Sequence, residues 1–274
     1  MPLKQQRTVW IICMAMLILF LYGIVASRIQ SRTDVILGGA DGAYVRSDSV
    51  SFTDPSLFAT PEPTEDNWPK IDITMNQYTM VNADHPISSS FRPDVMQISD
   101  SYMVFDSSAL PHLEDMIQGL KDAGFSVYVA GAYRSYSFQE QLFNGKASQI
   151  ALGLNPPVDD YMDPRYQEAV EKAKKITMFP GTSEHQLGLA VDLMDRNYTP
   201  QIYENMNQEF FAWLDAHCAE YGFIKRYPTR KLLLTGWDEP WHYRYVGVEA
   251  ATFIMEKGIC YEEFYAHYDP EFTY

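Results

Sequence analysis

Two short stretches of the sequence hold the residues best suited to metal-assisted chemistry. In SEHQLGLAVDL, His185 stands seven residues before Asp192, and in GWDEPWHYRYVG, Glu239 stands three residues before His242. Catalytic zinc commonly has three protein ligands, drawn from imidazole, carboxylate and thiolate groups, and one water molecule. We therefore expect His185, Asp192 and His242 to bind one zinc ion.

The fourth residue, Glu239, would then lie beside the metal without binding it. A zinc-bound water must lose a proton before it attacks a carbonyl carbon, and a neighbouring carboxylate is the natural base for that proton. Taken separately, each stretch has a simpler explanation. A structural pair of His185 with Asp192 could close a turn, and Glu239 could be a surface carboxylate. Only the combination predicts a hydrolytic metal site.

A strand is the element that would carry Asp192 to the metal. Alternate residues of a strand share a face, so one face of a strand at 187–194 would be apolar, with Leu187, Leu189, Val191 and Leu193. The other face would hold Asp192 beside two small residues, Gly188 and Ala190, which leave room above the sheet. His185, in the turn before this strand, can fold back beside Asp192.

Other residues of the same types fit the site less well. Asp195 would face the opposite side of the strand from Asp192, and Asp238 would point away from the metal. We exclude Ser183 as a nucleophile because no GxSxG motif surrounds it. The remaining histidines stand in no comparable pattern, and we interpret them as surface or structural residues: His85, His112, His217 and His267.

Apolar spacing and end signals predict the elements around these stretches. Helices are expected at 110–124, from the capping-box pair Ser137 and Glu140 onward, from Asp163-Pro164 to Ile176, and at 210–221. Strands are expected at 125–131, at 187–194, within 222–235 and at 241–246. Helices mixed with short strands predict an α+β fold with a small, mostly antiparallel sheet. No glycine-rich phosphate loop follows a strand, which excludes a Rossmann fold.

The N-terminus differs in composition from the rest of the chain. The stretch VWIICMAMLILFLYGIVA has eighteen residues without a charge. At about 1.5 Å per residue it nearly crosses a hydrocarbon layer about 30 Å thick. We expect a cytoplasmic tail at 1–8, a transmembrane anchor at 9–26, a linker rich in Pro, Ser and Asp at 27–70, and an extracytoplasmic domain at 71–274. A signal peptide cleaved near Ala26 is the alternative.

Charge and cysteine content exclude some classes of function. The net charge is −15, and every acidic residue follows the apolar segment. Nucleic acid attracts basic surfaces, so it is excluded as a partner. Beyond the apolar segment, Cys218 and Cys260 could pair, but two cysteines form no disulfide framework, and two small buried residues are the simpler interpretation. No CxxC motif supports a thiolate zinc site.

The two stretches and their flanks resemble a known family. SEHQLGLAVD is similar to the SxHxxGxAxD motif, and EPWH to the ExxH motif, of the zinc D-alanyl-D-alanine carboxypeptidases of the vancomycin-resistance VanY type. Further segments resemble that family in the same order: MVNADHP, AGAYRSYSFQEQLF, YGFIKRYP and TGWDEPWHYRYVG. The resemblance covers roughly 78–258. It implies the small α+β fold that these enzymes share with lysostaphin-type peptidases and the hedgehog signalling domain.

The resemblance also implies an activity and further site residues. It implies removal of the terminal D-alanine from peptidoglycan stem pentapeptides, with zinc at His185, Asp192 and His242 and with Glu239 as base. It implies that Arg134 stabilises charge on the reacting carbonyl, and that Gln139 and Ser183 bind the substrate. We expect a monomer at the bacterial cell membrane. An L,D-carboxypeptidase acting on tetrapeptides, and a non-catalytic wall-binding module with a structural zinc, stay open as alternatives.

Overall fold

The structure, a computed structural model, describes residues 67–195 and 207–273. The predicted tail, the apolar segment 9–26 and most of the predicted linker lie outside these residues. Within them, no helix is both long and apolar enough to span a bilayer. All described residues belong to one compact unit.

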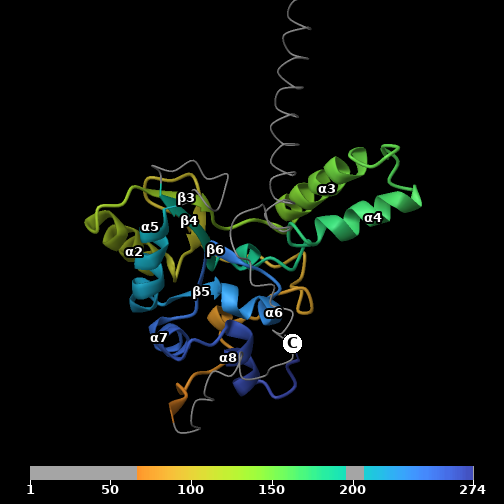
Figure 1. The fold of residues 1–274 in the computed structure, drawn as a ribbon. Coiled ribbons are helices and arrows are strands. Elements are labelled where there is room, and N and C mark those ends of the chain that lie inside the picture. Colours follow the sequence, from red (N-terminus) through yellow and green to blue (C-terminus); the bar gives the residue numbers. More distant parts are fainter. Residues whose placement is uncertain (1–66, 196–206, 274) are drawn as a thin grey trace, which may run out of the picture. The chain divides into compact units, whose positions relative to one another are not determined.

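A four-stranded antiparallel sheet forms the centre of the fold (Figure 1). Its strands lie in the order β3 (Val127–Gly131), β4 (Ala190–Asp195), β6 (Glu239–Tyr245) and β5 (Phe223–Tyr227). A separate antiparallel hairpin pairs β1 (Val95–Gln97) with β2 (Val104–Asp106). The expected small antiparallel sheet is therefore confirmed.

One face of the sheet packs into the larger hydrophobic core. Its strand residues include Val191, Leu193, Phe223 and Tyr243. Helices α2 (Leu110–Asp122) and α5 (Gln208–His217) cover this face, with Leu113, Leu120 and Leu214 fully buried. Burial of apolar surface contributes about 25 cal/mol per Å², so this face supplies most of the favourable free energy of folding. The four predicted core residues Leu187, Leu189, Val191 and Leu193 are all in this core, but strand alternation holds only from Ala190, where β4 begins.

The opposite face of the sheet carries polar side chains. Asp192 pairs directly with His242, and Ala190 pairs with Arg244. Directly paired residues point to the same side, so Asp192, His242 and Arg244 share this face. A second core around α7 (Val248–Lys257) and α8 (Tyr261–Tyr268) covers part of it and includes Ile224 of β5.

The remaining elements are short or lie beside the sheet. Helices α3 (Tyr136–Leu152) and α4 (Pro164–Ala173) pack against each other through Phe143, Ala147 and Ala173. The short helical segments are η3 (Asn76–Tyr78), η4 (Glu184–Leu187), η6 (Cys218–Tyr221), η7 (Thr229–Lys231) and α6 (Leu232–Thr235).

Several predicted element ends were wrong. Helix α3 begins at Tyr136, capped by Ser135, whose Oγ accepts a hydrogen bond from the Phe138 amide; Ser137 and Glu140 are exposed and form no capping box. Helix α4 ends at Ala173, so Ile176 lies beyond it and is 55% exposed.

Strand positions shifted as well. Residues 184–187 form the η4 turn rather than the start of a strand, and β4 begins only at Ala190. The strand expected within 222–235 is β5, and the rest of that range holds η7 and α6. These shifts leave the predicted elements and their order intact.

Candidate active site

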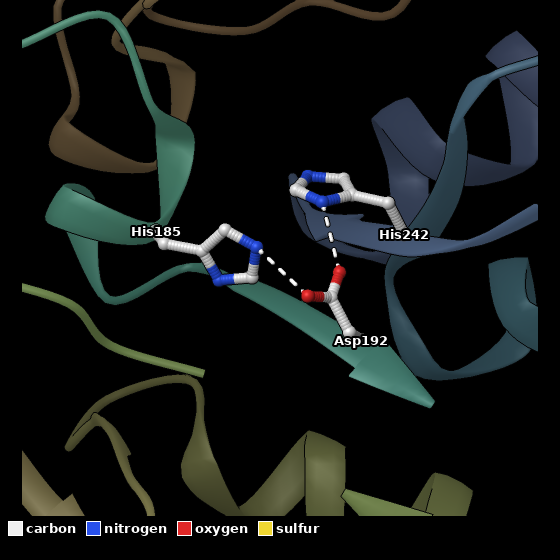
Figure 2. A group of neighbouring side chains, drawn as sticks. All are labelled: His185, Asp192 and His242. Atoms are coloured by element: carbon white, nitrogen blue, oxygen red, sulfur yellow. Dashed lines mark hydrogen bonds and ion pairs between the residues drawn. The ribbon is translucent and has the colours of Figure 1, made fainter. Parts of the chain in front are cut away.

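Three side chains from separate segments converge on one point of the polar face (Figure 2). His185 Nε2 lies 3.3 Å from Asp192 Oδ2, and His242 Nδ1 lies 3.1 Å from Asp192 Oδ1. One ligand atom from each residue falls within 4.8 Å of the other two. Two imidazole nitrogens and a carboxylate oxygen at this spacing suit zinc, which binds such atoms at about 2.0–2.2 Å. The three predicted ligands are thus brought together.

Backbone geometry fixes how each imidazole faces this point. His185 Nδ1 donates to the carbonyl of Ala132 at 2.7 Å, which leaves Nε2 free to bind a metal. The chain then turns at Gly188, whose φ of 76° is readily available only to glycine. This turn places His185 beside the strand that carries Asp192.

A bulge in β3 brings its backbone close to the metal site. Val129 pairs with Leu193 but Gly131 pairs with Asp192, so β3 has one extra residue here. A Cβ atom at Gly131 would lie 2.5 Å from Asp192 Oδ2. Only glycine lets β3 approach the carboxylate this closely.

A second irregularity aims Glu239 at the same point. Tyr227 pairs with Glu239 while Lys225 pairs with Tyr243, so β6 bulges between these pairs. Bulges re-aim side chains out of strict alternation, and Glu239 Oε2 accordingly lies 3.7 Å from His242 Nδ1. Burial raises the pKa of Glu239. A carboxylate with a raised pKa is a better proton acceptor near neutral pH. Glu239 is beside the ligands, as predicted for a base.

The pKa values of the two histidines shift in opposite directions. Burial lowers the pKa of His185, so its imidazole is neutral and able to bind metal at neutral pH. Burial acts the same way on His242, but hydrogen bonds with Asp192 and Glu184 outweigh it and raise the pKa to about 9. Burial opposes ionisation of Asp192 too, yet both histidines together hold its pKa well below its usual range. The Asp192 side chain in this pocket is therefore an ionised carboxylate at neutral pH.

A small pocket of about 170 Å³ opens over these residues. Arg134 lines it, and its Nη2 donates to Ser183 Oγ at 3.4 Å. Arg134 Nε has no hydrogen-bond partner within 67–195 or 207–273. Burial lowers the pKa of Arg134, while Asp192 and Glu239 act against that shift. A partly buried guanidinium that lines the pocket makes it suited to an anionic or carbonyl oxygen.

The sequence places this site within a known family. Residues 103–248 match the VanY family, described as D-alanyl-D-alanine carboxypeptidase. The chain belongs to the VanY family. It is 36% identical over 188 residues to a D-alanyl-D-alanine carboxypeptidase of Enterococcus faecalis, a match that spans 68% of this chain and 64% of that relative's length.

Solved structures of a VanY protein and of a second carboxypeptidase have a fold similar to that of this chain. A vancomycin resistance D,D-pentapeptidase VanY in complex with Zn(II) has a TM-score of 0.58 and 34% identity, covering 69% of this chain and 99% of that one. The LdcB LD-carboxypeptidase has a TM-score of 0.56 and 26% identity, covering 73% and 92%. The first of these was solved with Zn(II), the metal predicted for this chain.

Two residues expected to bind substrate lie in different settings. Ser183 lines the pocket. Gln139 is buried behind it, where its Nε2 donates to the carbonyl of Met178 at 2.7 Å. Because Met178 does line the pocket, Gln139 supports the pocket wall. Its direct contact with substrate stays a prediction.

Trp241 also lines the pocket. The two cysteines that follow the apolar segment can be placed as well. Cys218 and Cys260 are both buried free thiols, as the simpler interpretation had it. Burial raises the pKa of Cys218 to about 12.

Sequence reasoning missed several residues around the pocket. Glu184, Tyr227 and the segment 176–178 all line it. Burial would raise the pKa of Glu184, but Arg226 and Arg244 outweigh it and hold that pKa well below its usual range. A partial signal was available, since Arg226 and Arg244 each stand next to an aromatic residue in a strand, and a charge in a buried strand rarely lacks a partner.

Proposed function

We propose that this protein is a zinc carboxypeptidase that removes the terminal D-alanine from peptidoglycan stem pentapeptides. The observation that carries this proposal is the convergence of His185, Asp192 and His242 with Glu239 at one end of a small pocket. A purely structural zinc site has no use for a fourth residue that is an unliganded carboxylate of raised pKa. The D-alanyl-D-alanine carboxypeptidase name of the matching family gives the substrate class.

The residues divide the reaction between them. Bound zinc would lower the pKa of its water to about 7 and polarise the scissile carbonyl. Glu239 takes the proton from the attacking water and delivers it to the leaving amine, a role that its burial and raised pKa support. Arg134 faces the carbonyl oxygen as negative charge grows on it, and a fixed donor of this kind contributes about 2.7–4 kcal/mol.

Pocket size and charge support cleavage at a chain end. The volume of about 170 Å³ suits a terminal residue rather than the middle of a polymer. Ser183, whose Oγ accepts from Arg134 Nη2, can donate its hydroxyl proton to a substrate carboxylate. The side chain of Gln139 holds the neighbouring wall through Met178.

L,D-carboxypeptidase activity on tetrapeptides is a second candidate. The observation in its favour is the similarity to the LdcB LD-carboxypeptidase, which uses the same fold. The higher identities, 36% and 34%, are to proteins named for D-alanyl-D-alanine or D,D activity. We therefore place the D,D reaction first.

We also propose that the enzyme is a monomer that acts outside the bacterial membrane, held there by residues 9–26. The uncharged length of that segment and its preceding Lys4 and Arg7 support an anchor. The linker that follows would let the catalytic domain reach peptidoglycan near the lipid surface.

One assay separates these candidates. The purified full-length protein, loaded with zinc, is incubated with a stem pentapeptide ending in D-Ala-D-Ala and, separately, with the tetrapeptide that lacks the last residue. Released D-alanine is followed by mass spectrometry, with a chelator-treated control. Release from the pentapeptide alone is the expected result. Release from the tetrapeptide alone assigns the L,D reaction, and release from neither contradicts both candidates.

A further inference from the structure

Glu184 is a buried carboxylate whose two oxygens have separate partners. Oε1 accepts from Arg226 Nε at 2.8 Å and from Arg244 Nη1 at 3.0 Å. Oε2 lies 3.3 Å from His242 Nε2. The Glu184 side chain has no solvent exposure. Glu184 is next to His185 in the chain, but its side chain faces the other predicted zinc-binding histidine, His242.

This contact defines which nitrogen of His242 can bind metal. A carboxylate only accepts hydrogen bonds, so the imidazole carries a proton on Nε2, the nitrogen facing Glu184, and its second proton, on Nδ1 facing Asp192, is the one that zinc displaces. The lone pair of a neutral His242 then lies on Nδ1, which points at Asp192 and Glu239. We propose that Glu184 is a positioning residue that fixes the orientation and tautomer of His242 for zinc. The inference rests on the zinc site of the proposed function.

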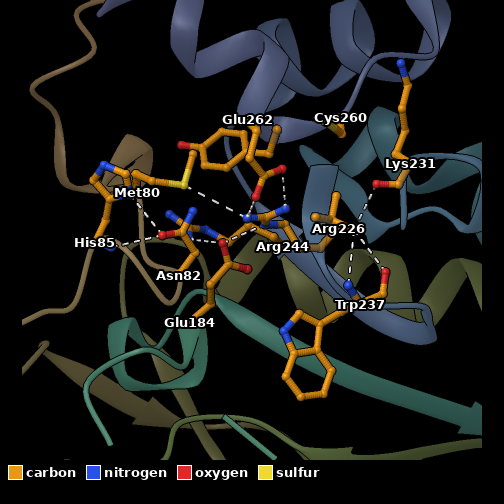
Figure 3. A network of polar contacts seen from close by, with 12 residues as sticks. Met80, Asn82, His85, Glu184, Arg226, Lys231, Trp237, Arg244, Cys260 and Glu262 are labelled. Carbon is orange, nitrogen blue, oxygen red and sulfur yellow. Dashed lines mark hydrogen bonds and ion pairs between the residues drawn. The ribbon is translucent and has the colours of Figure 1, made fainter. Parts of the chain in front are cut away.

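The surroundings hold Glu184 in place for this role. Arg226 also binds Glu262 of α8 through two parallel contacts, Nη2 to Oε1 at 2.6 Å and Nη1 to Oε2 at 2.9 Å (Figure 3). Arg244 is tied to the backbone carbonyls of Gln77 and Thr79 at 2.9 and 3.1 Å. Two arginines and two glutamates balance in charge. Glu184 therefore cannot rotate away from His242 without breaking a buried ion pair.

The cluster links a distant part of the chain to the metal site. Glu262 lies beyond residues 103–248, the range that matches the family. The ring of Tyr261 on α8 also packs 5.4 Å from the Arg226 guanidinium and 5.5 Å from that of Arg244. The C-terminal helix thus holds the arginines that hold Glu184.

A purely structural ion cluster is the competing explanation, and the chain supplies a matched control. Glu184→Gln and Glu262→Gln each remove one buried carboxylate that binds Arg226, but only Glu184 contacts His242. Glutamine has one acceptor oxygen where Glu184 uses two. Its NH₂ group must therefore face either the guanidinium groups or the Nε2 proton of His242.

The zinc dissociation constant of each full-length protein is measured by competition with a chelator. Loss of a partner that orients a ligand typically weakens metal binding 10- to 100-fold, so Glu184→Gln should raise the constant by about that factor and Glu262→Gln by less than about threefold. Thermal unfolding of each metal-free variant records how much stability each loses. Equal weakening of zinc binding by both variants would overturn the positioning role.

A measurement on the unmodified protein decides the matter if Glu184→Gln does not fold. Long-range ¹H–¹⁵N spectra of the zinc-loaded protein report which imidazole nitrogen of His242 carries a proton. The proposal requires a proton on Nε2 and metal on Nδ1, and the reverse assignment would overturn it. Neither readout depends on D-alanine release, so failure of the proposed activity and failure of this inference are distinguishable.

Discussion

Asp192 and His242 face each other directly across β4 and β6, and their side chains meet at 3.1 Å. Two of the three predicted zinc ligands are therefore fixed by one register of a sheet whose other face is in the hydrophobic core. A site built on packed strands is formed before metal arrives. In this it differs from small domains that fold only around their zinc.

This arrangement predicts that the protein stays folded without metal. After chelation, the far-ultraviolet circular dichroism should keep its shape and unfolding should remain cooperative, at a lower Tm. The decrease reflects only the lost binding energy, about 2.7 kcal/mol when zinc was present at 100 times its Kd. Collapse of the spectrum on chelation would instead indicate a structural zinc and favour the wall-binding alternative.

The close approach of Gly131 to Asp192 predicts a sensitive position in β3. In Gly131→Ala, the new methyl group meets the carboxylate oxygen at 2.5 Å, so the ligand must move. Zinc affinity measured by chelator competition should fall by at least about tenfold. The control is Gly145→Ala in exposed α3, where a Cβ meets nothing within 4 Å; it should leave zinc affinity unchanged and stabilise the helix by about 0.5–1 kcal/mol. Equal affinities for both variants would show that Asp192 does not depend on this glycine.

Zinc binding should depend on pH through His242. In the metal-free protein its pKa is raised to about 9, so at pH 7 the imidazole is protonated and zinc must displace a proton. His185, whose pKa is lowered, is already neutral there. Apparent affinity should therefore rise about tenfold per pH unit from pH 7 toward 9 and then level off.

Calorimetric titrations with zinc in two buffers of different ionisation enthalpy count the protons released at pH 7.5. About one proton per zinc is expected. No release would mean that His242 is already neutral in the free protein.

Arg134 should matter to turnover and not to metal binding. Its guanidinium lines the pocket but is no zinc ligand. Arg134→Ala should lower kcat by about 10²–10³, the scale of one lost donor to a developing oxyanion, with one zinc per chain retained. Steady-state kinetics and elemental analysis check the two halves of this statement. A variant that changed only KM would assign Arg134 to substrate binding alone.

The grouping of His185, Asp192 and His242 was predictable because its signal is local. Strand alternation around Asp192, and the short spacing from Glu239 to His242, are visible in single stretches of sequence. Helix α2 and strand β3 were predictable for the same reason, since regular apolar spacing continues through each of them.

What sequence reasoning missed depends on contacts between distant residues. From sequence alone, Glu184 would be expected at the surface. Its buried position depends on Arg226 and Arg244, which stand 42 and 60 positions away. The contact between Gln139 and Met178 joins residues 39 positions apart. The bulge that turns Glu239 toward His242 arises from pairing with β5 and has no local signature.

The most direct test of the central claim compares D-alanine release from a stem pentapeptide by the zinc-loaded protein and its Glu239→Gln variant. Asp238→Asn serves as control, because Asp238 is the adjacent, exposed carboxylate. Glu239→Gln should keep one zinc per chain and lose about 10²–10⁴ in rate, while Asp238→Asn stays near the unmodified rate. Near-normal release by zinc-loaded Glu239→Gln would contradict the assignment of Glu239 as base and, with it, the proposed mechanism.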